Sequence, residues 1–233
     1  MMEVTELMTN YEVKNYDEIR DSLRVRLMDM KSNADKLQDL IYEPMGCGYA
    51  LVAYMELPGS LAAGGIANVP KSFAQIEGAS KRLIMHDAMV GSMTAEQPRL
   101  CPIHDMLFGS AENLFPEDGP VEVEAGMPLV LTSDSGRLGA SVLYYPGVAK
   151  HLGDLVGGDY FVLPSSVHEV LILPDRGQAD PKELAMMVQQ INEAEVSPQE
   201  RLGNKVLHFR SDLQKLQVAA DMDHDKERGK ERS

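Results

Sequence analysis

The chain has 233 residues, of which 44% are hydrophobic and 25% are charged, a composition that excludes disorder along its whole length. Its formal net charge of −14 argues against a general binder of nucleic acids or anionic membranes. The longest apolar run, residues 49–55, is far shorter than the roughly 20 residues that a membrane-spanning helix needs, and the N-terminus lacks the pattern of a signal peptide. We therefore expect a soluble, cytoplasmic protein.

The first hundred residues are expected to contain several helices. Asn15 and Glu18 fit a capping box, and the apolar residues that follow recur at helical spacing, which predicts an amphipathic helix over 17–30. Asn33 is placed to cap a second, short helix. The apolar residues 48–57 are typical of a buried strand.

The middle of the chain mixes short strands and helices. Small residues weaken a possible strand over 61–69, and residues 70–93 predict one short and one longer helix. The apolar runs 129–132 and 140–145 flank turn-forming residues and predict a hairpin. Residues 146–156 then predict a helix, which two glycines end.

The last third contains the best-defined helix. Residues 160–163 and 167–173 predict two strands joined by a Pro-Ser-Ser turn. Asp180 and the Pro-Lys-Glu that follows it are well suited to begin a helix. Residues 205–209 predict a short strand that, at a sheet edge, could pair with a second copy of the chain in a homo-oligomer. The order of elements favours an α+β fold with a helical N-terminal part and a mostly antiparallel sheet.

The charge is unevenly distributed, and this suggests boundaries. Residues 101–200 carry a net charge of −12. Within them, 109–128 is rich in acidic residues, Gly and Pro, and we expect it to be a loop or a seam between two halves, 1–108 and 129–210. The charged segment 211–233 is expected to be a partly disordered tail.

No cofactor or metal site is expected from the residue spacing. Cys47 and Cys101 lack CxxC spacing, and we expect both to be reduced and packed as small hydrophobic residues. A metal site remains a hypothesis in which the His-acid pair at 168–169 combines with the pair at 104–105 or the pair at 86–87. None of these pairs has the spacing that places two His on one helical face.

The candidate site is the motif PSSVHE. Ser165, Ser166, His168 and Glu169 supply a nucleophile type, a base type and an orienting carboxylate type, which suggests a hydrolase. In an extended strand, however, His168 and Glu169 point to opposite faces, so the glutamate cannot orient the imidazole. The simpler interpretation is a turn whose Ser hydroxyls bond local backbone groups.

This motif also carries a resemblance. Residues 161–177, FVLPSSVHEVLILPDRG, resemble the phrase YILPSSIHEVILVP of an uncharacterised bacterial domain family of unknown function, found mostly in anaerobic Firmicutes. The resemblance is specific over 129–210 and extends in register over 11–210. Members of that family often begin with a further segment and carry Trp in the region of 68–80, whereas this chain has no Trp. The resemblance implies no particular activity.

Two functional hypotheses follow. The leading one is a non-enzymatic binding or accessory protein whose partner surface lies around Ser165, Ser166, His168 and Glu169. The acidity of this half favours a basic or cationic partner, either a protein or a small molecule. The alternative is a hydrolase that uses Ser166 or Ser165 with His168.

Overall fold

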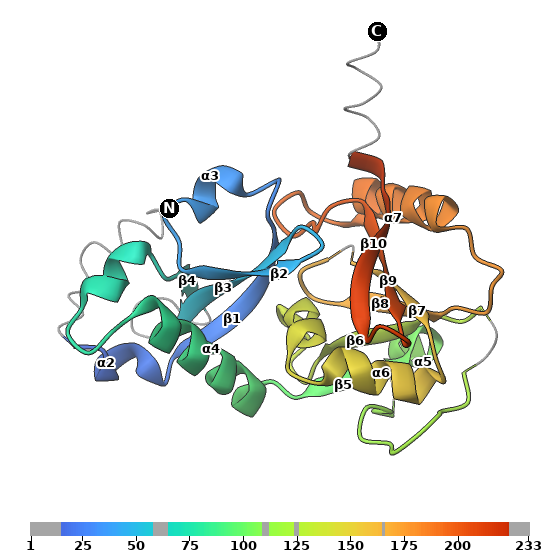
Figure 1. The fold of residues 1–233 in the computed structure, drawn as a ribbon, viewed down its shortest axis with the longest axis horizontal. Helices are drawn as coiled ribbons and strands as arrows, with labels where there is room; N and C mark the ends of the chain where they lie inside the picture. Colours follow the sequence, from blue (N-terminus) through green and yellow to red (C-terminus); the bar gives the residue numbers. More distant parts are fainter. Residues whose placement is uncertain (1–14, 58–64, 109–111, 124–125, 165, 224–233) are drawn as a thin grey trace, which may run out of the picture. The chain divides into compact units, whose positions relative to one another are not determined.

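The computed structural model describes residues 15–57, 65–108, 112–123, 126–164 and 166–223. The chain divides into two compact units, Met1–Ala95 and Glu96–Ser233. Each unit is built on its own antiparallel sheet with helices packed on it, which confirms the α+β class (Figure 1). No helix among these residues combines the length and the apolar character needed to cross a membrane.

The first unit contains a four-stranded sheet whose central strand is β3 (Tyr49–Glu56). On one side β3 pairs with β1 (Leu23–Asp29), and on the other side it pairs with β2 (Tyr42–Gly46) and β4 (Ile66–Asn68). The first seven residues of β3 are all buried. Burial on both faces explains why this strand is apolar throughout, as the sequence predicted.

The helices of this unit are α2 (Asp17–Arg20), α3 (Ala34–Leu37), the 3₁₀ helix η1 (Lys71–Gln75) and α4 (Lys81–Ala95). Helix α4 lies along β1, where the Ser92 Oγ accepts the Val25 N–H at 2.8 Å. A Cβ on Gly91 would come within 2.5 Å of the Leu23 carbonyl oxygen, so this approach requires glycine. The predicted pair of helices in 70–93, the short α3 and the strand β3 are all confirmed. The expected cap of α3 is not, because the Asn33 side chain makes no capping hydrogen bond and donates to the Asp29 carbonyl instead.

The predicted helix over 17–30 is wrong beyond its first turn. Only Asp17–Arg20 are helical, and the rest is strand β1, so the N-terminal part is not mainly helical. Leu23 and Leu27 are four residues apart and fit both a helical and a strand period. Leu23, Val25 and Leu27 are buried, whereas Arg24 and Arg26 between them are half-buried. This alternation has the period of two that is typical of a strand.

The second unit contains a six-stranded sheet in which all neighbouring strands are antiparallel. In spatial order the strands are β10 (Lys215–Asp221), β9 (Lys205–Arg210), β7 (Tyr160–Leu163), β8 (Val170–Pro174), β6 (Leu129–Ser133) and β5 (Pro98–Pro102). A short helix, α5 (Ile103–Phe108), follows β5.

Helices cover both faces of this sheet. On one face, Leu184 and Val188 of α7 (Pro181–Glu195) pack in a cluster with Phe161 of β7. On the other face, the Tyr160 hydroxyl donates to the Ala149 carbonyl of α6 (Val148–Val156) at 2.9 Å. Both helices are confirmed, and the expected N-cap of α7 is present, because the Asp180 side chain accepts the Lys182 N–H.

The predicted hairpin over 129–145 is half wrong. Residues 129–133 form β6, but its expected partner 140–145 is largely a 3₁₀ helix, η2 (Gly139–Tyr144). The Ser141 Oγ and N–H both donate to the Leu138 carbonyl, which closes a helical turn at this point. The place beside β6 is taken instead by β8 on one side and β5 on the other.

Three expected boundaries also differ from the structure. The units divide between Ala95 and Glu96, ahead of segment 109–128, because β5 pairs with β6 and so belongs to the second unit. Residues 215–221 of the expected tail are ordered, since β10 forms a hairpin with β9. The rest of that tail, 224–233, lies outside the described residues. Because of the same hairpin, the strand at 205–209 lies inside the sheet, between β10 and β7, and is not an edge strand.

Candidate functional site

The PSSVHE motif lies in the connection between β7 and β8. Ser166 is 5% exposed, and its Oγ accepts the His168 N–H at 3.0 Å. The backbone of Val167 is held on both sides, since its N–H donates to the Glu200 carbonyl at 2.9 Å and its own carbonyl accepts the Ala140 N–H at 3.2 Å. Two segments distant in the sequence thus fix the conformation of this turn.

The His168 ring has hydrogen-bonding groups at both of its nitrogens. The Leu138 N–H donates to Nδ1 at 3.2 Å, and Nε2 lies 3.3 Å from the Glu200 Oε1. Because a backbone N–H can only donate, Nδ1 is the acceptor and Nε2 carries the proton, which points at the carboxylate. A hydrogen bond from the Ser197 Oγ, followed by the one from His168, lowers the pKa of Glu200.

Three segments come close together at the backbone of His168. The Thr132 Oγ1 donates to the His168 carbonyl at 2.8 Å. A Cβ on Gly139 would overlap the Thr132 Oγ1 and would lie 2.5 Å from the Ser133 N and 2.6 Å from the His168 O. The preceding Leu138 has a left-handed φ of 53°, an uncommon conformation for a leucine. Only glycine fits at 139, so the position of His168 depends on this residue.

Glu169 differs from Glu200, the other carboxyl described near His168. Burial raises its pKa, with a further increase from the charge of Glu200 and an opposing effect of His168. The side chain is half-buried, and over residues 15–223, leaving out the gaps named above, no hydrogen bond or ion pair reaches its carboxyl group. The site therefore contains two glutamates near one imidazole, of which only Glu200 has partners.

Among the residues that the structure describes, no serine hydroxyl contacts the His168 imidazole. The Ser166 hydroxyl contacts the backbone of His168, and the described contacts of the ring are with Leu138 and Glu200. Ser165 lies outside the described residues. The predicted strand over 167–173 begins only at Val170, because the bond to Ser166 bends the chain ahead of it.

Glu200 was missed by the sequence argument. Ser197 and Glu200 have the S-x-x-E spacing of a capping box, and their side chains do bond to each other at 2.7 Å. That spacing predicts the local contact. It does not predict that the same glutamate meets His168, which is 32 residues away in the chain.

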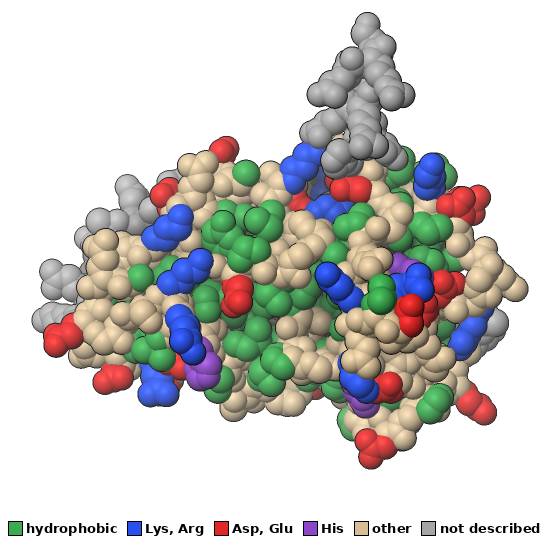
Figure 2. Space-filling view, in the orientation of Figure 1, with side chains coloured by type: hydrophobic (Ala, Val, Ile, Leu, Met, Phe, Trp, Pro, Cys, Tyr) green, Lys and Arg blue, Asp and Glu red, His purple; other side chains and the backbone are tan. Residues whose placement is uncertain are grey.

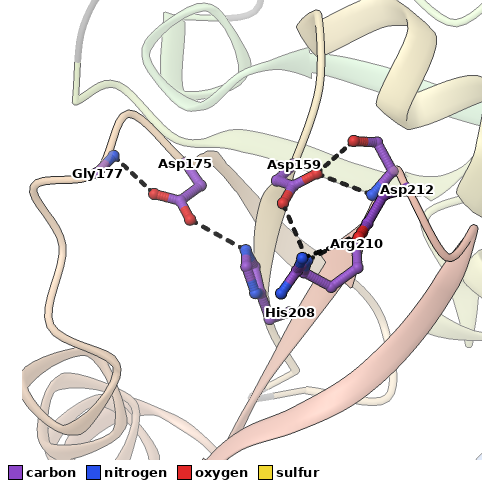
Figure 3. A network of polar contacts seen from close by, with 7 residues as sticks. Asp159, Asp175, Gly177, His208, Arg210 and Asp212 are labelled. Carbon is purple, nitrogen blue, oxygen red and sulfur yellow. Dashed lines mark hydrogen bonds and ion pairs between the residues drawn. The ribbon is translucent and has the colours of Figure 1, made fainter.

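A second polar network in this unit lies at the start of β7 and the end of β9 (Figure 3). Asp159 accepts both the N–H and the Oγ–H of Ser211, and these bonds lower its pKa. The His208 Nε2 lies 3.0 Å from the Asp175 Oδ2, a contact with the distance but not the angles of a hydrogen bond. Because Asp175 also accepts the Gly177 N–H and Asp212 pairs with Arg210, all three carboxylates of this network have partners, and the network ties strand ends together.

The metal hypothesis gains no support from the geometry. Among the residues that the structure describes, no three His, Cys, Asp or Glu side chains come together as a ligand set. The His86 Nδ1 contacts its neighbour Asp87 at 2.9 Å, and the His104 Nδ1 contacts Asp105 at 3.5 Å, so each pair is local. Burial raises the pKa of the Cys101 thiol, which disfavours the reactive thiolate.

The acidity of the chain does not form one patch on the visible surface. Figure 2 shows Asp and Glu side chains interspersed with Lys and Arg over the face that it presents. The net charge of −14 therefore does not define a binding surface by itself. Within the described ranges, Glu169 is a carboxyl that no hydrogen bond or ion pair reaches.

Comparison with known proteins gives a family. One protein-family model, described as a family of unknown function (DUF5688), matches residues 2–211. No curated protein and no solved structure matches the chain.

Proposed function

The chain belongs to DUF5688, a family of unknown function, and we propose that it is a non-enzymatic binding protein whose partner surface includes His168, Glu169 and Glu200. The partner presents a cationic group, an ammonium or a guanidinium, to the two glutamates. The observation that carries this proposal is the half-buried Glu169 carboxyl, which lacks a hydrogen bond or ion pair among the described residues.

A cation is the group that this site requires. A carboxylate that has lost part of its hydration regains stability when a charged donor approaches it, and one charge-assisted hydrogen bond contributes about 1.5–3 kcal/mol. Such a contribution corresponds to a factor of roughly 10–150 in affinity. Glu200 adds negative charge nearby, which raises the pKa of Glu169 and attracts the same cation.

The rigidity of the turn supports a recognition role. Ser166, Val167 and His168 are each held by hydrogen bonds, so binding requires little ordering of the backbone. The Nε2 proton of His168 faces Glu200 and keeps that carboxylate in place. The same contacts give the hydrolase alternative no Ser–His pair among the described residues, which favours the binding role.

A titration with a basic peptide tests the proposal. The full chain is titrated with a tetra-arginine peptide by calorimetry, with a tetra-glutamate peptide as the negative control. Glu169→Gln is expected to weaken binding at least tenfold. Glu195→Gln, which removes the same charge from an exposed position near the end of α7, is the matched control and is expected to change it less than twofold.

Two results would contradict this function. Absence of measurable binding to the basic peptide would contradict the proposal that this surface recognises a cationic group. Equal losses in Glu169→Gln and Glu195→Gln would show that the peptide responds only to overall charge and not to this site.

A further inference from the structure

The six-stranded sheet of the second unit has two edges, and one of them is covered. Strand β5 forms that edge and carries a proline at each end, where no backbone N–H is available. Between the prolines, the Leu100 N–H donates to the Asn113 Oδ1 at 2.9 Å, and the Leu100 carbonyl accepts the Leu114 N–H at 2.7 Å. Prolines and a covering segment keep an edge strand from pairing with another chain.

The opposite edge, formed by β10, is more open to another chain. Among the described strands, β10 pairs only with β9. It contains no proline, and the five residues between its charged ends are uncharged. Four of its seven residues are exposed, among them the central Val218 at 46%. Its one irregularity is a bulge in the pairing with β9, between Val218 and Ala220.

The charges at the two ends of β10 match a second copy of the same strand. Lys215 and Asp221 are each three residues from Val218. An antiparallel pair that is symmetric about Val218 therefore places each lysine opposite the aspartate of the other copy. A parallel pair in register would instead place like charges opposite each other, which is destabilising.

Lys215 has no counter-charge in its own hairpin. The register places it opposite Arg210 of β9, which carries the same charge. Arg210 itself already pairs with Asp159 and Asp212. Over the described residues no carboxylate forms an ion pair with Lys215. A carboxylate from another chain is therefore the group that this end of the strand lacks.

We propose that the β10 edge pairs antiparallel with the same edge of a second copy, in a homodimer symmetric about Val218. The Lys215 ammonium of each copy donates to the Asp221 carboxylate of the other. That carboxylate accepts the Asp223 N–H at 3.0 Å and has lone pairs for further donors. Because pairing of two edge strands buries a small area, the dimer is expected to dissociate at roughly micromolar concentrations. This interface does not depend on the cation site at Glu169.

Analytical ultracentrifugation of the full chain over about 1–100 µM tests the dimer. The natural chain is expected to shift from monomer to dimer across this range. Lys215→Glu brings two like charges together at each end of the interface and should raise the dissociation constant about tenfold or more. Lys182→Glu, the same charge change at an exposed position of α7, is the matched control and should change it less than twofold.

The stability of Lys215→Glu separates loss of the dimer from loss of the fold. In the monomer this substitution places opposite charges across the hairpin, because position 215 faces Arg210. The thermal midpoint of the variant, measured where the natural chain is monomeric, should therefore equal or exceed that of the natural chain.

Cross-linking tests the register of the pair. Val218→Cys places two thiols opposite each other, with Cβ atoms about 4.5–5.5 Å apart, and mild oxidation should give a covalent dimer. Gln217→Cys, also at an exposed position, is the matched control and should react several-fold more slowly, because its two copies are diagonal neighbours about 7–8 Å apart. The natural chain, which contains Cys47 and Cys101, gives the background.

Several outcomes would overturn the proposal. One is a natural chain that stays monomeric over the whole concentration range. Another is a dimer that Lys215→Glu weakens no more than Lys182→Glu does. Equal rates of cross-linking for Val218→Cys and Gln217→Cys would exclude the symmetric register. A lower midpoint for monomeric Lys215→Glu would show that the lysine already has a stabilising partner in its own chain.

Discussion

Gly139→Ala is expected to be one of the most damaging small substitutions in the second unit. The added methyl group would overlap the Thr132 Oγ1 and lie 2.5 Å from the Ser133 N and 2.6 Å from the His168 O. Two of these atoms belong to the backbone, so the overlap cannot be relieved by turning a side chain. We expect the free energy of unfolding to fall by about 3 kcal/mol through overpacking and by about 1 kcal/mol through loss of the Thr132–His168 hydrogen bond.

A loss of about 4 kcal/mol corresponds to a fall of roughly 8–16 °C in the thermal midpoint of a unit of this size. The matched control is Gly136→Ala in the same loop. Gly136 has a left-handed φ of 68° and nothing within 4 Å of the added Cβ, so only the backbone cost of about 1 kcal/mol applies. Thermal unfolding followed by circular dichroism compares the two. Equal midpoints for both variants would refute the packing described around His168.

Three further predictions concern the same unit. Because burial raises the pKa of Glu169, folding favours its protonated form, and the stability that this form contributes is lost as pH rises through the folded pKa. Glu169→Gln should therefore flatten the decline in urea midpoint above pH 4.5. An unchanged slope would count against the raised pKa of Glu169. Glu200 has a lowered pKa, so its contribution to stability has the opposite pH dependence and is lost as pH falls. Glu200→Gln should therefore reduce stability at neutral pH and have little effect once acid has protonated the natural residue. An effect that persists in acid would argue against the ion pair between Glu200 and His168. The buried Ser166 should not react with a fluorophosphonate probe. Ser166→Ala should lower the free energy of unfolding by about 1 kcal/mol, because the His168 N–H loses its acceptor. Labelling of the natural chain that disappears in Ser166→Ala would instead support the hydrolase hypothesis.

The elements predicted from sequence are those in which one period dominates. Strand β3 is buried on both faces, and its short, continuous apolar run favours a strand over a helix. Helix α7 combines a helical stripe with an Asp-Pro start that the structure reproduces at Asp180. In β1, by contrast, Leu23 and Leu27 satisfy two periods at once, and only the pairing with β3 decides between them.

The candidate site shows a similar limit. The Ser166 turn is predictable from sequence because it is a local feature, in which the hydroxyl bonds a backbone group two residues away. The environment of His168 is made by Leu138 and Glu200, which lie about thirty residues away on either side in the chain. Such contacts depend on how the strands are ordered in the sheet, and the order β10-β9-β7-β8-β6-β5 could not be deduced from one sequence.

The pKa of Glu169 tests the central claim most directly. It can be measured in the full chain by ¹³C NMR of the side-chain carboxyl, first alone and then with saturating tetra-arginine. A half-buried carboxyl without a partner predicts a value above the ordinary range in the free protein and a fall when the cation binds, since the cation stabilises the charged form. An ordinary pKa that the peptide leaves unchanged would contradict the assignment of Glu169 as the group that recognises a cationic partner.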